Sequence, residues 1–226
     1  MKNSARLASL TVAAFGIACG GTSTPTSTDM AHGPVTTGCV PTGYTALPFL
    51  STDPVRSFAQ ADMTLVAGKD YVAAIDTDIG CIALDLYEQQ TPVTTNSFVF
   101  LALHHFFDGL AFHRVLDGFV AQTGDPNSAS GPPSSWGTGG PGYMFGLEVS
   151  PDLNFDAAGV VGMARATDPS TNGSQFFITL DAAGSLDQKY TVFARVLSSL
   201  DLLPSIVRGE PPDAPTRITQ VTIASK

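Results

Sequence analysis

Short apolar and β-branched runs, separated by turn residues, follow one another from residue 71 to the C-terminus. Runs of about four to eight such residues have the length of strands, whereas helices are usually longer. Asp78, Ile79 and Gly80 separate the first two runs, which predicts a hairpin there. In all, the pattern predicts strands at residues 71–76, 81–87, 112–116, 120–123, 160–164, 176–180, 192–196 and 217–224.

Two segments depart from the strand pattern and predict helices. Residues 92–105 (PVTTNSFVFLALHH) begin with proline, which suits the first turn of a helix. Apolar residues occur on all sides of this helix, so most of it should be buried. A second, shorter helix is expected at residues 198–207. Many short strands with one early and one late helix indicate a mainly β fold, α+β by count, arranged as a closed or nearly closed barrel.

The N-terminus has a different pattern, that of an export signal. Lys2 and Arg6 precede an apolar run at residues 7–18. As a helix this run would reach about 18 Å, too short for a hydrocarbon core of about 30 Å. A basic start followed by a short apolar run that ends in small residues is typical of a signal peptide, which we assign to residues 1–18.

Cys19 follows the predicted signal directly, in the context GIAC. This resembles the lipobox of bacterial lipoproteins, in which the cysteine after the cleavage site becomes lipidated. Gly16 stands where that pattern usually has a larger aliphatic residue. Two interpretations therefore stay open: lipidation of Cys19, or ordinary cleavage near Ala18 that leaves Cys19 as a plain thiol.

Composition divides the rest of the chain into three parts. Residues 19–38 are rich in Thr, Ser, Gly and Pro and have little apolar content, so we expect a flexible tether. Residues 39–70 contain prolines that interrupt regular structure, and we expect an irregular extension that packs on the domain. The compact domain is assigned to residues 71–226.

Charge and cysteine content narrow the function classes. The 226 residues carry 11 Lys and Arg against 20 Asp and Glu, a net charge of −9, which argues against binding to nucleic acid or to anionic lipid. Membrane attachment is expected only through a lipid on Cys19. Cys39 and Cys81 would then remain as a pair in an oxidising compartment, either disulfide-bonded or as two unrelated buried thiols.

Generic catalytic motifs are absent or out of context. Gly137, Gly139 and Gly142 satisfy G-x-G-x-x-G, but no strand precedes them and Pro141 lies among them, which argues against a dinucleotide site. The sequence contains no H-E-x-x-H, C-x-x-C or G-x-S-x-G. We therefore expect no metal, no cofactor and no covalent nucleophile.

The segment 112–126 (FHRVLDGFVAQTGDP) has the pattern of a hairpin that turns at Asp117-Gly118. A two-residue turn would place Arg114 and Gln122 on opposite faces, whereas a three-residue loop would pair them on one face. In that second case an arginine and an amide lie together on an apolar surface. An unpaired guanidinium is costly to bury, so Arg114 should face either a carboxylate or a ligand.

This hairpin and the segment 159–180 (GVVGMARATDPSTNGSQFFITL) resemble the signature regions of the cyclophilins, a class of peptidyl-prolyl cis-trans isomerases. Residues 76–102 (DTDIGCIALDLYEQQTPVTTNSFVFLA) and 137–143 (GTGGPGY) fit the same family, the latter in the style of bacterial members. The resemblance covers about residues 71–224 and implies a closed eight-stranded antiparallel β-barrel capped by two helices.

The resemblance also implies roles for individual residues. Those expected in catalysis are Arg114, Phe119 and Gln122. Those expected to bind the substrate are Val120, Ala164, Arg165, Gln175, Phe177, Leu186 and Tyr190. Four positions depart from the usual family residue: Val120 replaces Met, Arg165 replaces Asn, Ser185 replaces Trp and Tyr190 replaces His. The loss of the indole at Ser185 predicts weak cyclosporin affinity.

The function implied is acceleration of X–Pro rotation in proline-containing polypeptides that are unfolded or folding. Together with the signal, this predicts a monomeric isomerase of the bacterial cell envelope, either periplasmic or tethered to the membrane as a lipoprotein. A proline-peptide-binding or chaperone-like module with little isomerase activity is the alternative, because residues 120, 165 and 185 depart from the usual pattern.

Overall fold

The computed structural model describes residues 38–226, and its sheet is antiparallel and nine-stranded. The predicted signal peptide, Cys19 and all of the predicted tether except Gly38 lie outside the described residues. The strands are β1 Thr45–Ala46, β2 Tyr71–Thr77, β3 Gly80–Leu86, β4 Arg114–Leu116, β5 Val120–Thr123, β6 Val160–Met163, β7 Phe176–Thr179, β8 Val192–Val196 and β9 Ile218–Ser225. The helical elements are α1 Pro92–Leu103 and the short 3-10 helices η1 Pro126–Ala129, η2 Pro133–Ser135, η3 Gly184–Leu186 and η4 Leu200–Ser205.

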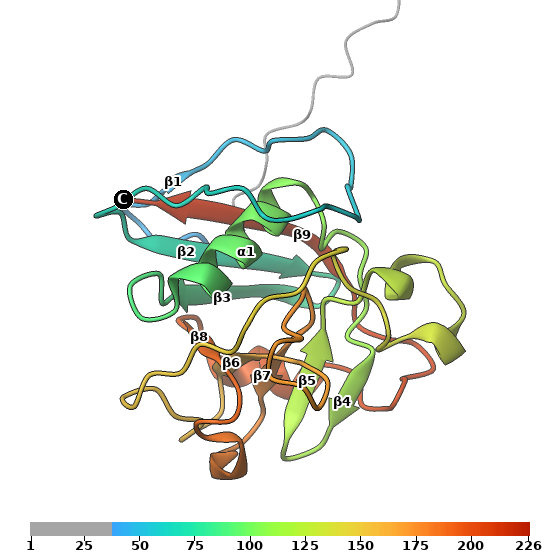
Figure 1. Cartoon of the computed structure of the whole chain (residues 1–226). Coiled ribbons are helices and arrows are strands. Elements are labelled where there is room, and N and C mark those ends of the chain that lie inside the picture. Colours follow the sequence, from blue (N-terminus) through green and yellow to red (C-terminus); the bar gives the residue numbers. More distant parts are fainter. Residues whose placement is uncertain (1–37) are drawn as a thin grey trace, which may run out of the picture. The chain divides into compact units, whose positions relative to one another are not determined.

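The sheet curls into an open half-barrel, so the predicted closed barrel of eight strands is wrong. The strands follow the order β1-β9-β2-β3-β8-β6-β7-β5-β4, and the outer strands β1 and β4 do not pair (Figure 1). Opposite β4 lies the chain before β9, which reaches it only through isolated bridges such as Val115 with Gly209. Pro211, Pro212 and Pro215 in that segment have no amide hydrogen, so a continuous ladder cannot form there.

The eight predicted strands are confirmed, each within two residues of its expected ends. The ninth strand, β1, was not predicted because residues 39–70 contain no run with a clear strand pattern. It has two residues and pairs with the end of β9, Thr45 opposite Ser225 and Ala46 opposite Ala224. A strand this short depends on a ready-made edge for its hydrogen bonds, which local sequence does not reveal.

The first predicted helix forms as α1, and residues Thr94–Leu103 of it are buried. Its first turn is capped by a distant side chain: the carboxylate of Glu148 accepts hydrogen bonds from the amides of Val93 and Thr94 at 3.1 and 2.7 Å. The second predicted helix is present only as the 3-10 helix η4. Pro204 lies inside it and cannot donate the backbone hydrogen bond that a longer α-helix would need.

Two clusters of apolar side chains form the core. The larger lies between α1 and the sheet, where Phe98 stacks on Phe107 with ring centroids 5.1 Å apart and meets Phe176 edge-on. Figure 1 shows α1 lying across β2 and β9 on this side. The smaller cluster contains Val120, Phe155, Val160, Phe177, Ala183 and Val192. It lies beneath the hairpin β4–β5 and the loops beside it, and so supports the candidate site.

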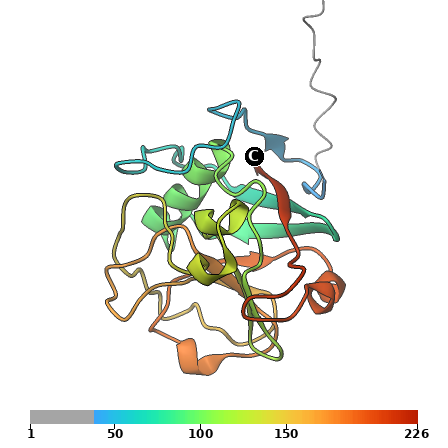
Figure 2. The ribbon, with the colours of Figure 1, turned by 90° about the vertical axis from the view of Figure 1, so that its right-hand side faces the viewer.

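The extension before β2 packs along the domain (Figure 2). Its backbone bonds to three separate parts: Leu47 N to Ile223 O, Leu50 N to Leu103 O, and Phe58 N to Pro141 O, all within 2.8 Å. Cys39 and Cys81 form a disulfide that joins the start of the extension to β3. In residues 38–226, the helices are all too short or too polar to cross a membrane.

Candidate active site

One groove of about 930 Å³ lies beside the hairpin β4–β5. Its walls come from β4, β5 and β7, from residues 137–144, from the loop after β6 and from η3. All ten residues that the sequence proposed for catalysis and substrate binding line this one groove: Arg114, Phe119, Val120, Gln122, Ala164, Arg165, Gln175, Phe177, Leu186 and Tyr190. The structure therefore brings together residues spread over almost eighty positions of the chain.

The hairpin has the three-residue loop, and the two-residue turn is excluded. Arg114 lies opposite Gln122, and Leu116 lies opposite Val120. The amide of Phe119 donates to Leu116 O at 3.1 Å, and Gly118 has a φ of +62°, which favours glycine. This register places the Arg114 guanidinium and the Gln122 amide on the same face, and both line the groove.

Arg114 faces a carboxylate and the groove at once. Its Nε donates to Glu210 Oε1 at 2.5 Å, with side chains 32% and 57% exposed. The guanidinium makes no other hydrogen bond within residues 38–226, so its Nη groups stay free to donate. The sequence did not predict Glu210, which lies 96 residues away in a loop. The bridge between Val115 and Gly209 and the ion pair of Arg208 with Asp117 bring that loop near.

A chain of amide hydrogen bonds crosses the groove. Gln122 Nε2 donates to Gln175 Oε1 at 2.9 Å, and Gln175 Nε2 donates to Gly139 O at 2.8 Å. Both glutamines are thereby held in fixed orientation, with their remaining amide atoms available to a peptide. The link ends at residues 137–142, the glycine-rich segment.

Asp125, a residue that the sequence did not select, holds this glycine-rich segment in place. Its buried carboxylate accepts hydrogen bonds from the amides of Asn127 at 2.7 Å, Gly139 at 3.2 Å and Gly137. A Cβ on Gly139 would lie 2.2 Å from Asp125 Oδ1, so only glycine fits there. The G-x-G-x-x-G pattern thus wraps around a carboxylate of its own chain.

The other wall of the groove is apolar. Phe177 stacks against Phe155 with ring centroids 5.5 Å apart and meets Tyr190 edge-on at 6.0 Å. Phe119 and Leu186 pack against the same cluster. A Cβ on Gly162 would lie 2.7 Å from both Phe155 and Phe177, so glycine there allows the two rings to approach. The result is an apolar pocket beside the Arg114 and Gln122 side chains.

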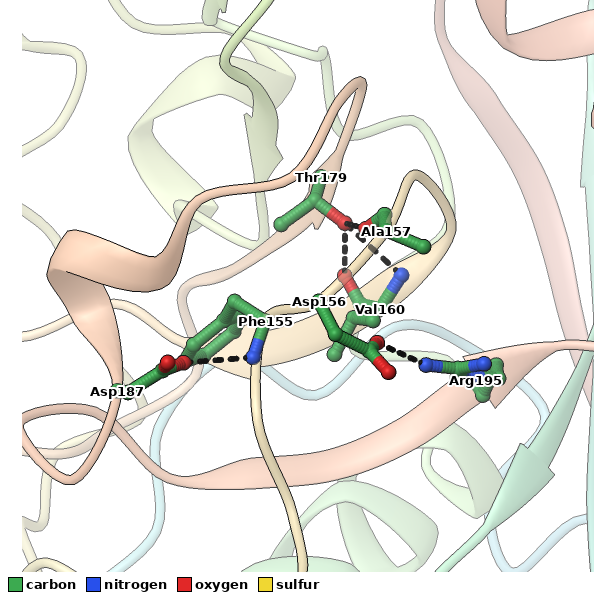
Figure 3. A network of polar contacts seen from close by, with 7 residues as sticks. All are labelled: Phe155, Asp156, Ala157, Val160, Thr179, Asp187 and Arg195. Atoms are coloured by element: carbon green, nitrogen blue, oxygen red, sulfur yellow. Dashed lines mark hydrogen bonds and ion pairs between the residues drawn. The ribbon is translucent and has the colours of Figure 1, made fainter.

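The backbone around Phe155 is held by polar contacts on both sides (Figure 3). Asp187 Oδ1 accepts from Phe155 N at 2.7 Å, and Arg195 pairs with Asp156. Thr179 Oγ1 donates to Ala157 O at 2.8 Å and accepts from Val160 N at 2.9 Å. These bonds fix the ring that supports Phe177 from below. Within residues 38–226, no three His, Cys, Asp or Glu side chains lie together as a metal site.

Comparison with known proteins identifies the family. The model of the family "Cyclophilin type peptidyl-prolyl cis-trans isomerase/CLD" matches residues 72–225. The chain belongs to this family. It is therefore an enzyme of the peptidyl-prolyl cis-trans isomerase class, and its fold is mainly β and cyclophilin-like.

Individual cyclophilins resemble the chain over most of their own length. Peptidyl-prolyl cis-trans isomerase-like 3 of Gallus gallus is 41% identical over 133 residues, which are 58% of this chain and 79% of the relative. Peptidyl-prolyl cis-trans isomerase ppi1 of Schizosaccharomyces pombe is 39% identical over 143 residues, 62% of this chain and 89% of the relative. Both are eukaryotic, so the bacterial lipoprotein character stays a prediction.

A solved cyclophilin of Cryptosporidium parvum has the same fold. It superimposes with a TM-score of 0.61 at 28% identity, over 68% of this chain and 97% of that chain. The same protein has also been solved in the presence of the dipeptide Ala-Pro. The part of the chain that aligns with known cyclophilins is thus the part that contains the groove.

His113 lies just behind the groove of this cyclophilin and is 4% exposed. A Cβ on Gly137 would lie 3.9 Å from its ring, so the histidine packs beneath the glycine-rich segment. Burial lowers the pKa of His113, and the negative charge of Asp125 only partly opposes this effect. The folded protein therefore holds His113 neutral at pH values where an exposed histidine would be charged.

This burial predicts that the protein loses stability in mild acid. Below about pH 6.5 the unfolded chain takes up a proton on residue 113 that the folded chain does not, so stability should fall with pH by up to about 1.4 kcal/mol per unit. Urea unfolding at pH 7 and pH 5 measures the loss. The variant His113→Asn should show a smaller loss over the same interval, and an equal loss would contradict the assignment.

Proposed function

We propose that the groove accelerates rotation about X–Pro bonds of exported polypeptides, with Arg114 stabilising the twisted amide. The observation that carries the proposal is the placement of a guanidinium with free Nη donors beside an apolar pocket. The Ala-Pro dipeptide used with the Cryptosporidium parvum cyclophilin supports a proline ring as the occupant of such a pocket.

Amide chemistry explains why this arrangement can catalyse rotation. The X–Pro bond resists rotation by about 18–20 kcal/mol because the nitrogen shares its lone pair with the carbonyl. In the twisted transition state that sharing is lost, and the nitrogen becomes a hydrogen-bond acceptor. A donor from Arg114 near this nitrogen binds the twisted state more strongly than either planar state, which is the condition for catalysis.

The rest of the groove divides the peptide between a fixed and a moving part. Phe119, Phe177 and Leu186 provide apolar contacts for the proline ring, which stays in place. The carbonyl before the proline rotates, and the side-chain amides of Gln122 and Gln175 line the groove where they can donate hydrogen bonds to it. Rotation breaks no covalent bond and transfers no proton.

An isomerisation assay on the full chain with a short X–Pro peptide tests the proposal. Uncatalysed exchange takes tens of seconds or longer at 25 °C, so catalysis is directly visible as a faster approach to equilibrium. Peptide binding measured in parallel separates the alternative. If peptides bind while the exchange rate equals the uncatalysed rate, the groove is a proline-peptide-binding module and the proposed catalysis is wrong.

The site of action is proposed to be the bacterial cell envelope, with the protein monomeric and held by a lipid on Cys19. The export-signal pattern at residues 1–18 supports this, and the Cys39–Cys81 disulfide is typical of an oxidising compartment. In a bacterial host the mature chain should start at Cys19 and sediment with membranes, and Cys19→Ala should shift it to the soluble fraction. A mature chain that retains residues 1–18 would contradict export.

A further inference from the structure

The charged side chains that line the groove are both cationic. Arg114 and Arg165 line it, and among the described residues no Asp or Glu does. This is unusual in a chain of net charge −9. Arg114 is already paired with Glu210, whereas Arg165 forms no ion pair within the described part of the chain. The charge of Arg165 is therefore available to a ligand.

Arg165 is held rigidly by backbone oxygens. Its Nε and Nη2 donate to Lys189 O at 3.1 and 2.7 Å, and its Nη1 donates to Ala166 O and Thr167 O at 2.8 and 3.0 Å. The guanidinium carbon also lies 4.6 Å from the centre of the Tyr190 ring. Carbonyl oxygens orient a guanidinium without neutralising it, so its positive charge stays fixed at the rim of the groove.

A second cation lies beside Arg165. The ammonium of Lys189 donates to Ser185 O at 3.0 Å, and Lys189 has no ion pair within residues 38–226. Neither nearby carboxylate forms an ion pair with these two cations: Asp187 accepts from Phe155 N (Figure 3), and Asp168 accepts from Ser170. The pKa of Asp168 is lowered first by its bonds to Ser170, and Arg165 contributes least.

This cationic end adjoins the apolar pocket. Tyr190, on which Arg165 stacks, meets Phe177 edge-on at 6.0 Å, and Phe177 forms the pocket wall. The Tyr190 ring therefore lies between the Arg165 guanidinium and the pocket wall at Phe177. Successive Cα atoms are about 3.8 Å apart, so a side chain one or two residues from a proline in the pocket would be long enough to reach toward Arg165.

We propose that Arg165, together with Lys189, selects substrates with an acidic side chain within two residues of the proline. The inference rests on the proposed function of the groove and adds to it a preferred class of polypeptide. A partly exposed ion pair is weak, so the preference should be about two- to fivefold at low salt. Because the charges are near the surface, added salt should reduce it.

The test compares matched X–Pro peptides that carry Glu, Gln or Lys at one of four positions: the two before the proline and the two after it. For each peptide, both kcat/KM and the dissociation constant are measured with the full chain. We expect the Glu peptide to exceed the Gln peptide about two- to fivefold at one position or more, with Lys weakest there. Arg165→Gln should bring the ratio of Glu to Gln close to one, and Arg165→Lys should keep part of it.

Lys69→Gln is the matched control, because it removes an exposed charge that does not line the groove and should keep the preference. If the native protein isomerises Glu, Gln and Lys peptides equally at all four positions, the inference is wrong and the proposed function stands. If it isomerises none, the proposed function fails, and the dissociation constants alone decide the preference. A preference that survives Arg165→Gln would also overturn the inference.

Discussion

Replacing Arg114 with alanine should lower kcat/KM for X–Pro rotation by about 100- to 1,000-fold, the usual cost of removing one preorganised donor to a transition state. The effect should be large because no other cation of the described chain is placed to substitute: Arg165, which also lines the groove, is bound to the carbonyl oxygens of residues 166, 167 and 189. The loss should fall mainly on kcat. A protease-coupled or NMR exchange assay measures it.

Two further variants make the result interpretable. Arg114→Lys keeps the charge but not the planar group that bonds Glu210 and, in the proposed mechanism, the substrate as well, so most of the activity should still be lost. Lys69→Ala removes a charge outside the groove and should stay within about twofold of the native rate. If Arg114→Ala folds and keeps more than about a tenth of the native kcat/KM, Arg114 is not the main catalytic donor.

The hairpin that contains Arg114 shows which part of the site local sequence can predict. The number of residues between Leu116 and Val120 sets the register of the two strands. Because side chains alternate between the two faces of a strand, the register then decides which side chains share a face. The register with Arg114 opposite Gln122 could therefore be stated in advance as one of two choices. The apolar pocket could not be derived in this way, and its residues came from the resemblance to cyclophilins.

Contacts between distant loops could not be predicted from the sequence. Glu210 meets Arg114 across 96 residues, and nothing near Glu210 distinguishes it from other surface acids. The open edge of the sheet was missed for the same reason: it depends on how β1 and the proline-rich chain before β9 reach strands far away. The local sequence pattern predicts the lengths of the strands. Whether the sheet closes into a barrel depends instead on pairing between segments that are far apart in the sequence.

Asp125 is the second residue whose replacement should have a large effect, here on stability as well as on activity. Asp125→Ala removes a buried carboxylate that accepts from three amide groups, those of Asn127, Gly137 and Gly139. A hydrogen bond to a charged group contributes about 1.5–3 kcal/mol, so the free energy of unfolding should fall by about 3–5 kcal/mol. Urea unfolding at pH 7 measures this loss.

The same replacement should reduce activity, because Gly139 O accepts the hydrogen bond that orients Gln175, and Gln175 orients Gln122. Asp125→Asn keeps one acceptor oxygen and the size of the side chain, so it should fold and lose less stability than the alanine variant. Asp213→Ala is the control: Asp213 is exposed, and its change should stay within about 0.5 kcal/mol of native. If Asp125→Ala and Asp213→Ala unfold at the same urea concentration, the carboxylate does not anchor the glycine-rich wall. If Asp125→Asn instead retains native stability but loses kcat/KM, the amide bonds lost with the second carboxylate oxygen serve the geometry of the groove rather than the fold.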